Sequence, residues 1–118
     1  MPNQVVATKG LERSAQLILD DITHIAVGTG TATPTSGDVK LATETQRNTP
    51  TKAIRQGARL HIRTLFSNAD LPATMEEIGW FMNGTGTIDS GELLVRALLN
   101  FVKGNDDLIA IVQLTIKE

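Results

Sequence analysis

The sequence contains no cysteine and no tyrosine, and its aromatic side chains are only three Phe and one Trp. Without cysteine the chain has no disulfides, no thiolate metal site and no thiol nucleophile. So few aromatic residues predict an aliphatic core. They also argue against sugar binding, because sugars stack on exposed aromatic rings and Trp80 is the one Trp that could serve.

The chain also lacks a large net charge and a long hydrophobic run. Its formal net charge is −2 at pH 7, which argues against a protein that grips nucleic acid phosphates. No apolar run reaches the roughly 18–20 residues that a membrane-spanning helix needs. The first residues, MPNQVVATKG, lack the layout of a signal peptide, so we expect the chain to be made and used without export.

What remains is the composition of one globular domain. The chain has 118 residues, of which 41% are hydrophobic and 20% are charged, and these values suit a single soluble domain. Residues 1–8 are polar and β-leaning, and we expect them to form an extended arm ahead of a domain over residues 9–118. Apolar residues recur at helical spacing over residues 9–21, which predicts a short amphipathic helix with Thr8 as a candidate N-cap.

Residues 76–101 predict the hairpin around which the rest of the chain is organised. Two apolar runs, 78–82 and 93–101, flank a segment rich in Gly, Thr, Ser and Asp. Apolar runs bounded by such turn residues are typical of paired strands. The pair also contains the single Trp, so we expect it to lie in the core.

Other strand patterns and turn signals suggest the fold class. Strands are predicted for 22–27, 51–66 with a turn or bulge at Gly57, and 107–117, whereas 41–50 is ambiguous between a helical turn and a strand. Turn signals recur at roughly 8–12 residue spacing. We therefore predict a mainly β domain, an antiparallel β-sandwich or a jelly-roll-like barrel, with one short N-terminal helix.

Alternation after Gly57 predicts a strip of basic side chains on one face of a strand. Arg59, His61 and Arg63 share that face, and Arg55 joins them if the register continues through Gly57. The strip is interpreted either as a docking surface for an acidic partner or as a solvated outer face. Two residues of the arm are further candidate partner contacts, because the arm could reach a neighbouring subunit: Val5 and Val6.

The glycines Gly28 and Gly30 follow a predicted strand, which raises the question of a phosphate-binding loop. The third glycine of a dinucleotide fingerprint is missing, and so is the Gly-Lys-Ser/Thr of a Walker loop. We interpret the segment as a tight bend that leaves the strand, and we expect no cofactor.

Histidines and paired carboxylates give no catalytic or metal pattern. His24 and His61 lie on separate predicted strands without a third ligand, so we interpret them as core or surface residues. Adjacent carboxylates such as Glu76 and Glu77 point to opposite faces of a strand, and solvated strand-end positions are the favoured interpretation. We expect no catalytic residue, no metal and no small-molecule substrate.

Three segments of the chain resemble virion proteins of tailed bacteriophages. Residues 22–47 (ITHIAVGTGTATPTSGDVKLATETQR) are similar to a phage pattern of a strand, GTGT, Ala/Thr-Pro-Thr, Leu, and then Glu and Arg. Residues 77–81 (EIGWF) are similar to the EIGLF strand of such proteins. Residues 91–99 (GELLVRALL) are similar to their GxLLARALL strand. The order of the three segments supports the resemblance, although residues 80–83 replace the more usual Leu-Phe-Asn.

This resemblance implies a non-enzymatic structural protein, made in the host bacterial cytoplasm and incorporated in the virion. Such sequences occur as capsid decoration (cement) proteins and as parts of tail fibre, neck or baseplate proteins. Because we expect one domain without a fibrous repeat, we favour a decoration protein on the outer head surface. Its expected partners are the major capsid protein and itself, as a homotrimer, with no nucleic acid or membrane. The alternatives are a tail fibre, neck or baseplate component and, from another class, a small β-sandwich enzyme or carbohydrate-binding module.

Overall fold

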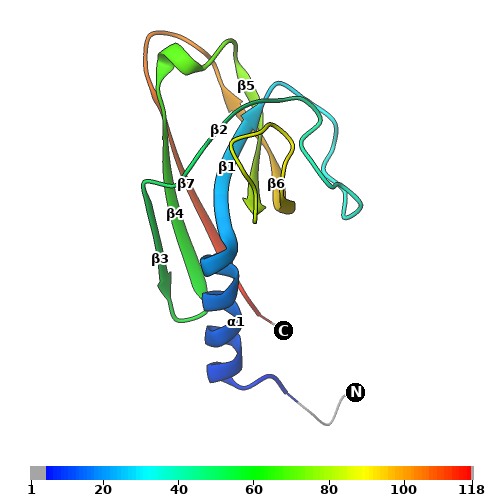
Figure 1. Ribbon diagram of the computed structural model, residues 1–118, viewed down its shortest axis with the longest axis vertical. Coiled ribbons are helices and arrows are strands. Elements are labelled where there is room, and N and C mark those ends of the chain that lie inside the picture. The colour runs from blue at the N-terminus through cyan, green and yellow to red at the C-terminus, as the bar shows by residue number, and fades with distance from the viewer. Residues whose placement is uncertain (1–4, 118) are drawn as a thin grey trace.

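The computed structural model describes residues 5–117, which form one α-helix, one short 3-10 helix and seven strands (Figure 1). In chain order they are α1 (Thr8–Asp21), β1 (Ile22–Gly28), β2 (Glu44–Asn48), β3 (Lys52–Gln56), β4 (Arg59–Phe66), η1 (Asn68–Asp70), β5 (Met75–Met82), β6 (Glu92–Phe101) and β7 (Leu108–Thr115). The ambiguous segment 41–50 therefore contains a strand, β2.

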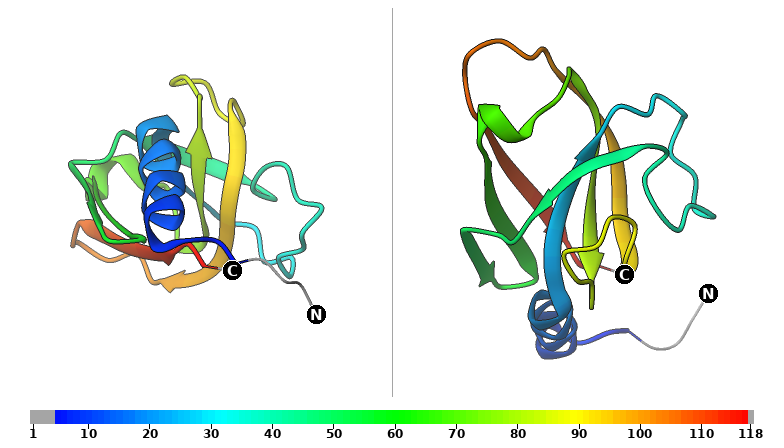
Figure 2. Two further views of the ribbon diagram at one scale, coloured as in Figure 1. Left: turned by 90° about the horizontal axis from the view of Figure 1, so that it is seen from below. Right: turned by 45° about the horizontal axis from the view of Figure 1, so that its top comes forward.

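Two antiparallel sheets pack against each other, which confirms the predicted β-sandwich with one N-terminal helix (Figures 1 and 2). The four-stranded sheet has the order β2-β1-β5-β6, and the three-stranded sheet has the order β3-β4-β7. The predicted hairpin is present as β5 and β6, and the predicted turn at Gly57 joins β3 to β4. Gly57 has a φ of +62°, a conformation that favours glycine.

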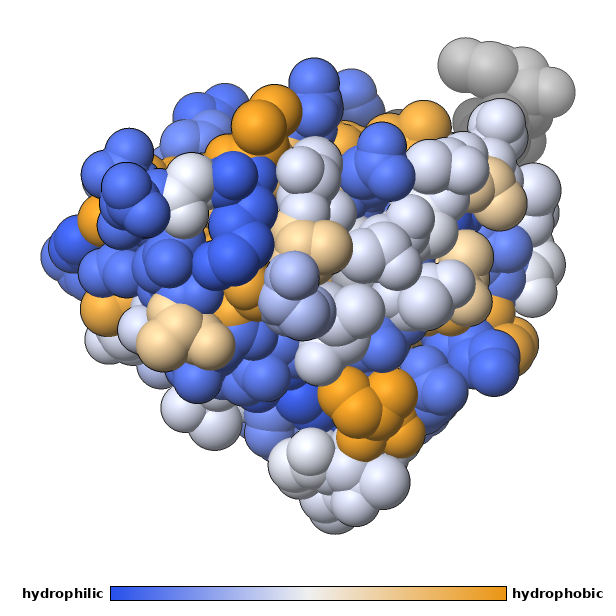
Figure 3. All heavy atoms as spheres, turned by 90° about the horizontal axis from the view of Figure 1, so that it is seen from above, coloured by the Kyte–Doolittle hydropathy of each residue, from blue (hydrophilic) through white to orange (hydrophobic). Residues whose placement is uncertain are grey.

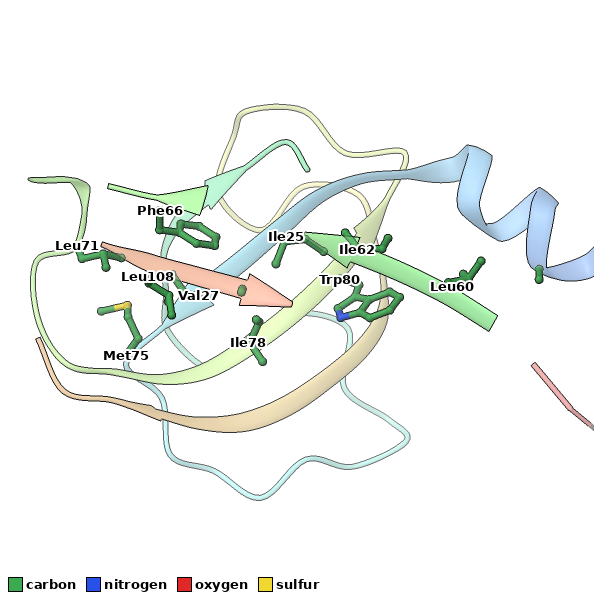
Figure 4. Close-up of a cluster of buried hydrophobic side chains, with 12 residues drawn as sticks. Ile25, Val27, Leu60, Ile62, Phe66, Leu71, Met75, Ile78, Trp80 and Leu108 are labelled. Carbon is green, nitrogen blue, oxygen red and sulfur yellow. The ribbon is translucent and has the colours of Figure 1, made fainter. Parts of the chain in front are cut away.

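The core between the sheets is aliphatic, as predicted, with Trp80 at 3% exposure among its largest members (Figure 4). It is built from alternate residues of β1, β4, β5 and β7, such as Ile25, Ile62, Ile78 and Leu108. β5 is buried along most of its length because both of its faces are covered: Ile78 and Trp80 pack into the core, and Phe81 packs against Leu41 on the other side. β6 is an edge strand and is only partly buried, although its sequence is equally apolar.

The helix α1 stands at one end of the sandwich and runs directly into β1 (Figures 1 and 2). It buries Ala15 and packs Ile18 and Leu19 against the core. The prediction of Thr8 as its N-cap is wrong: Ala7 is the N-cap, and its small apolar side chain makes no capping hydrogen bond. In the part of the chain described, no helix is long and apolar enough to cross a membrane.

The expected arm over residues 1–8 falls partly outside the described residues. Thr8 already belongs to α1, and residues 5–7 precede the helix without regular structure. At the opposite end of the sandwich the surface combines hydrophilic residues with residues of intermediate hydropathy, and the hydrophobic patches on it are separate (Figure 3).

Candidate functional site

The outer face of the four-stranded sheet is covered by the chain itself. Segment 29–43 projects beside this sheet (Figure 2), and a small apolar cluster separate from the main core lies on the sheet's outer side. The cluster consists of Ala26, Leu41 and Phe81, with Leu93 packed against it. We call this surface, with segment 29–43 and loop 83–91 bound to it, the covered face.

A buried carboxylate fastens segment 29–43 to the covered face. The side chain of Glu77 is fully buried and accepts four hydrogen bonds. Its Oε2 accepts from the backbone amides of Gly30, at 2.8 Å, and Thr43, at 2.7 Å. Its Oε1 accepts from the Ala42 amide at 2.8 Å and from Arg96 Nε at 3.0 Å. The prediction that Glu77 is a solvated strand-end residue is therefore wrong.

These hydrogen bonds decide the charge state of Glu77. Burial by itself raises the pKa of a carboxyl group, because it disfavours the charged form. The amides of Thr43 and Ala42, the Arg96 guanidinium and the Gly30 amide outweigh that effect and hold the pKa of Glu77 below its ordinary value. Glu77 is thus a carboxylate at neutral pH, and its charge is matched inside the protein.

Gly28 and Gly30, where β1 leads into this segment, are required by the structure for a reason that sequence reasoning did not identify. A Cβ on Gly30 would lie 2.4 Å from Glu77 Oε2, and a Cβ on Gly28 would lie 2.1 Å from the Thr43 carbonyl oxygen. Neither glycine has a positive φ, so a tight bend is not what requires them. Glycine is needed because the backbone approaches the Glu77 carboxylate closely, and the anion held by this loop is the protein's own.

Arg96 extends the network to the middle of segment 29–43. Its Nη1 donates to Asp38 Oδ2 at 3.1 Å, and its Nη2 donates to the Ala32 carbonyl at 2.8 Å. The hydrogen bonds from the Thr35 amide and hydroxyl, and then the Arg96 guanidinium, hold the pKa of the Asp38 carboxyl below its usual range. Arg96 therefore connects β6 to two points of segment 29–43 and to Glu77 of β5.

A second buried ion pair fastens loop 83–91. Arg47 donates to both carboxylate oxygens of Glu44, at 2.6 and 2.8 Å, and the two side chains are 2% and 0% exposed. Its Nη1 also donates to the Thr85 carbonyl at 3.0 Å and to Ser90 Oγ at 2.9 Å. The guanidinium stacks 4.5 Å above the Phe81 ring centroid.

The three segments with the phage-like patterns meet at this covered face. Each supplies residues to the network or to the apolar cluster beneath it: Gly28, Gly30, Leu41, Glu44 and Arg47 from the first, Glu77 and Phe81 from the second, and Leu93 and Arg96 from the third. The patterns therefore mark structural contacts between distant parts of the chain.

The outer face of the three-stranded sheet is different, because no segment of the described chain is fastened over it. Its β4 residues are Arg59, His61, Arg63 and Leu65, flanked by Lys52, Ile54 and Gln56 of β3 and by Ile109, Ile111, Gln113 and Thr115 of β7. We call this the bare face. It confirms the predicted alternation, in which Arg59, His61 and Arg63 share one side of the strand.

Arg55 does not belong to this strip, contrary to prediction. The turn at Gly57 pairs Arg55 with Leu60, which points into the core, so Arg55 lies on the inner side of the sheet. There its Nε donates to Gln16 Oε1 of α1 at 3.0 Å, and its Nη1 donates to the Gly57 carbonyl at 2.8 Å. The pairing register across the turn, and not continued alternation, decides which face Arg55 occupies.

The bare face combines exposed aliphatic side chains with basic side chains. Ile54, Leu65, Ile109 and Ile111 are 41%, 43%, 48% and 66% exposed. An open groove of about 210 Å³ includes two of them, Ile54 and Ile111, in its lining, together with Lys52, Gln56, His61, Ile62 and Arg63. No acidic residue belongs to the bare face as defined.

The other candidate contact residues, Val5 and Val6, lie ahead of α1 and not on the bare face. They are 81% and 49% exposed. The structure therefore does not join them with Arg59, His61 and Arg63 in one surface.

The histidines lie in different sheets, His24 in β1 and His61 in β4. Burial, and then the nearby Arg47 charge, lower the pKa of His24. Among residues 5–117 no group of three or more His, Cys, Asp or Glu side chains is placed to hold a metal ion.

Sequence reasoning missed Glu77, Arg96, Glu44 and Arg47 as connected residues. Two features of the sequence could have indicated them. Glu77 directly precedes the apolar run 78–82, and Gly28 and Gly30 follow a strand at positions where a close neighbour could require glycine. No family model and no curated protein matches the chain.

Proposed function

We propose that the chain is a non-enzymatic structural protein of a tailed-phage virion, a decoration (cement) protein that binds the outer head surface and bridges capsid subunits. Its partners are the major capsid protein and further copies of itself, as a trimer. The resemblance of residues 22–47, 77–81 and 91–99 to phage virion proteins supports the proposal.

The observation that carries the proposal is the bare face. Its aliphatic side chains, up to 66% exposed at Ile111, lie on a sheet whose other side is packed into the core. A contiguous exposed apolar surface with polar surroundings is typical of a protein interaction site. A rigid sheet loses little conformational freedom on binding, which favours its use as a docking surface.

The physical mechanism is mass action. A domain that binds two capsid subunits buries surface that exists only in the assembled shell, and this stabilises the assembled state. An interface of the standard size, roughly 1,600 Å² in total, suffices for specific binding. Trimeric repetition strengthens the binding through effective concentration.

Quantitative mass spectrometry of purified particles tests this function. We expect hundreds of copies per particle, all of them in heads separated from tails. A few copies per particle, located in tails, would support the alternative of a tail fibre, neck or baseplate component. Absence from both fractions would refute a virion role.

A further inference from the structure

We propose that the bare face binds an extended protein segment that has an aliphatic half and an acidic half. The inference deepens the proposed function, because it gives the chemistry of the partner that this face recognises. The distribution of side chains on β4 and β7 supports it. The pair Leu65 and Ile109 makes one end of the face aliphatic, and Arg63, His61 and Arg59 follow along β4.

The aliphatic end of the bare face lies where β4 ends and β7 begins. Leu65 pairs with Ile109, and the next outward pair is Arg63 with Ile111. Beyond this point the outward residues are His61 with Gln113, and then Arg59 with Thr115. Along β4 and β7 the outward residues thus change from aliphatic to basic and polar within a few positions, whereas on β3 the aliphatic Ile54 lies opposite His61.

The basic part of the face has no counter-charge. Lys52 lies directly opposite Arg63 in the β3–β4 pair. Like charges in such positions destabilise a sheet. Neither side chain makes an ion pair or a hydrogen bond with residues 5–117, whereas four other basic residues do pair with carboxylates. A partner carboxylate between Lys52 and Arg63 would relieve this repulsion, and Arg63 offers a planar fork for it.

Beside Lys52 and Arg63, His61 also has a polar atom without a hydrogen-bond partner among the described residues. Its Nε2 is buried and makes no hydrogen bond, and its side chain lines the groove together with Lys52 and Arg63. Buried polar atoms are nearly always hydrogen-bonded in folded proteins. A carboxylate bound in the groove between the two cations would therefore lie beside the His61 side chain.

The remaining features favour a protein segment over nucleic acid. The bare face has no Phe, Tyr or Trp ring on which bases could stack. The chain as a whole carries 13 acidic and 11 basic residues, so an excess of basic over acidic side chains is a local property of this face. Outward side chains of an extended segment repeat at about 6.6–6.8 Å, the same spacing as the outward residues of β4 and β7. A segment lying along these strands would therefore match the aliphatic and basic ends in turn.

Titration of the isotope-labelled full chain with a synthetic peptide, followed by amide NMR shifts, tests the proposal. The peptide has three isoleucines followed by three aspartates, and the control peptide has lysine at each aspartate position. We expect shifts confined to β3, β4 and β7 with the acidic peptide, and at least tenfold weaker binding of the lysine peptide.

Two matched pairs of variants separate charge from apolar contact. Arg63→Glu should weaken binding of the acidic peptide at least tenfold, whereas Arg13→Glu, the same change on exposed α1, should leave it unchanged. Ile111→Ser should weaken binding about fivefold, and Leu17→Ser, at a position 53% exposed on α1, should have no effect.

Any of the following binding results would overturn the inference: no shifts on the bare face, equal binding by Arg63→Glu, equal binding of the lysine peptide, or displacement of the acidic peptide by a short DNA duplex. Self-association of the wild type that Arg63→Glu abolishes would assign the face to a second copy, and this too would overturn it. The result is independent of the particle count. If the protein is abundant in heads but does not bind the peptide, the proposed function stands and this inference is refuted.

Discussion

The two outer faces of the sandwich place arginines in opposite environments. On the covered face Arg47 and Arg96 have side chains only 2% and 4% exposed, and each is paired with a carboxylate. On the bare face Arg63 is exposed, and within the described chain its side chain has no ion pair. The same residue type thus stabilises the fold on one face and remains available for binding on the other.

The length of the connections explains the difference. Residues 29–43 join β1 to β2 and residues 83–91 join β5 to β6, and both segments are fastened onto the covered face. Residues 57 and 58 alone join β3 to β4, so nothing from this turn can reach over the bare face. Charged residues beneath a long connection should therefore matter for stability, and those beside a short one for recognition.

We expect the largest loss of unfolding free energy from a substitution of Glu77, at the centre of the covered face. Glu77→Gln removes the charge that four donors surround and leaves Arg96 with one carboxylate partner fewer. Breaking a buried ion pair costs roughly 3–5 kcal/mol of unfolding free energy. Urea unfolding measures it, with Glu76→Gln on the same strand as control, for which we expect less than about 0.5 kcal/mol. Equal losses of stability in the two variants would contradict the conclusion that Glu77 fastens segment 29–43 to the covered face.

Acid unfolding tests whether the charge of Glu77 stabilises the fold. The folded-state pKa of Glu77 is lowered, so its contribution to stability is present above the ordinary value of 4.5 and is lost as the pH falls through the folded-state pKa. We expect the wild type to lose stability below pH 4.5 more steeply than Glu77→Gln, measured as unfolding free energy from pH 6 to pH 3. Parallel curves would show that Glu77 is not the group responsible.

A smaller effect is expected from closing the space beside the carboxylate. In Gly30→Ala the new methyl would lie 2.4 Å from Ala42 Cβ and from Glu77 Oε2, so the segment must shift. Such overpacking costs about 1–3 kcal/mol. Gly37→Ala, in the same segment but with its nearest neighbour at 3.9 Å, should change thermal stability little. A Gly30→Ala protein as stable as Gly37→Ala would mean that the close approach is not required.

We expect the smallest change in stability from a substitution on the bare face. Arg63→Glu replaces a like-charge pair with an opposite-charge pair across Lys52, so it should raise unfolding free energy by about 0.2–1 kcal/mol. Added salt should reduce this gain, since exposed charges are screened. A large loss of stability would show that the bare face supports the fold, and the contrast between the faces would fail.

The strands were predictable from sequence because alternation and turn residues act locally. The alternation of Leu60 and Ile62 with His61 and Arg63 identified both faces of β4, and Gly57 identified the turn. The face of Arg55 was not predictable in this way, because it depends on which residue of β4 lies opposite. Likewise, Thr8 was a reasonable cap by type, but the helix began one residue earlier than the pattern suggested.

The covered face was beyond local reasoning for a different reason. Glu77 accepts hydrogen bonds from Thr43, Ala42 and Gly30, which precede it in the chain by 34, 35 and 47 positions. No local sequence pattern indicates such distant partners. Adjacent carboxylates on a strand do point to opposite faces, but only the fold shows that the face of Glu77 is buried by segment 29–43. The bare face was partly predictable, because its basic strip needed only alternation, whereas its aliphatic end required the pairing of β4 with β7.

The order of Gly30 and Glu77 along the chain has a consequence for synthesis on the ribosome. Segment 29–43 emerges first, and its anchor follows 47 residues after Gly30. At translation rates of roughly 5–20 residues per second, the interval is on the order of a few seconds. During that time the amides of Gly30, Ala42 and Thr43 are hydrated by water, and a nascent chain halted before β5 should be cut readily by protease within this segment.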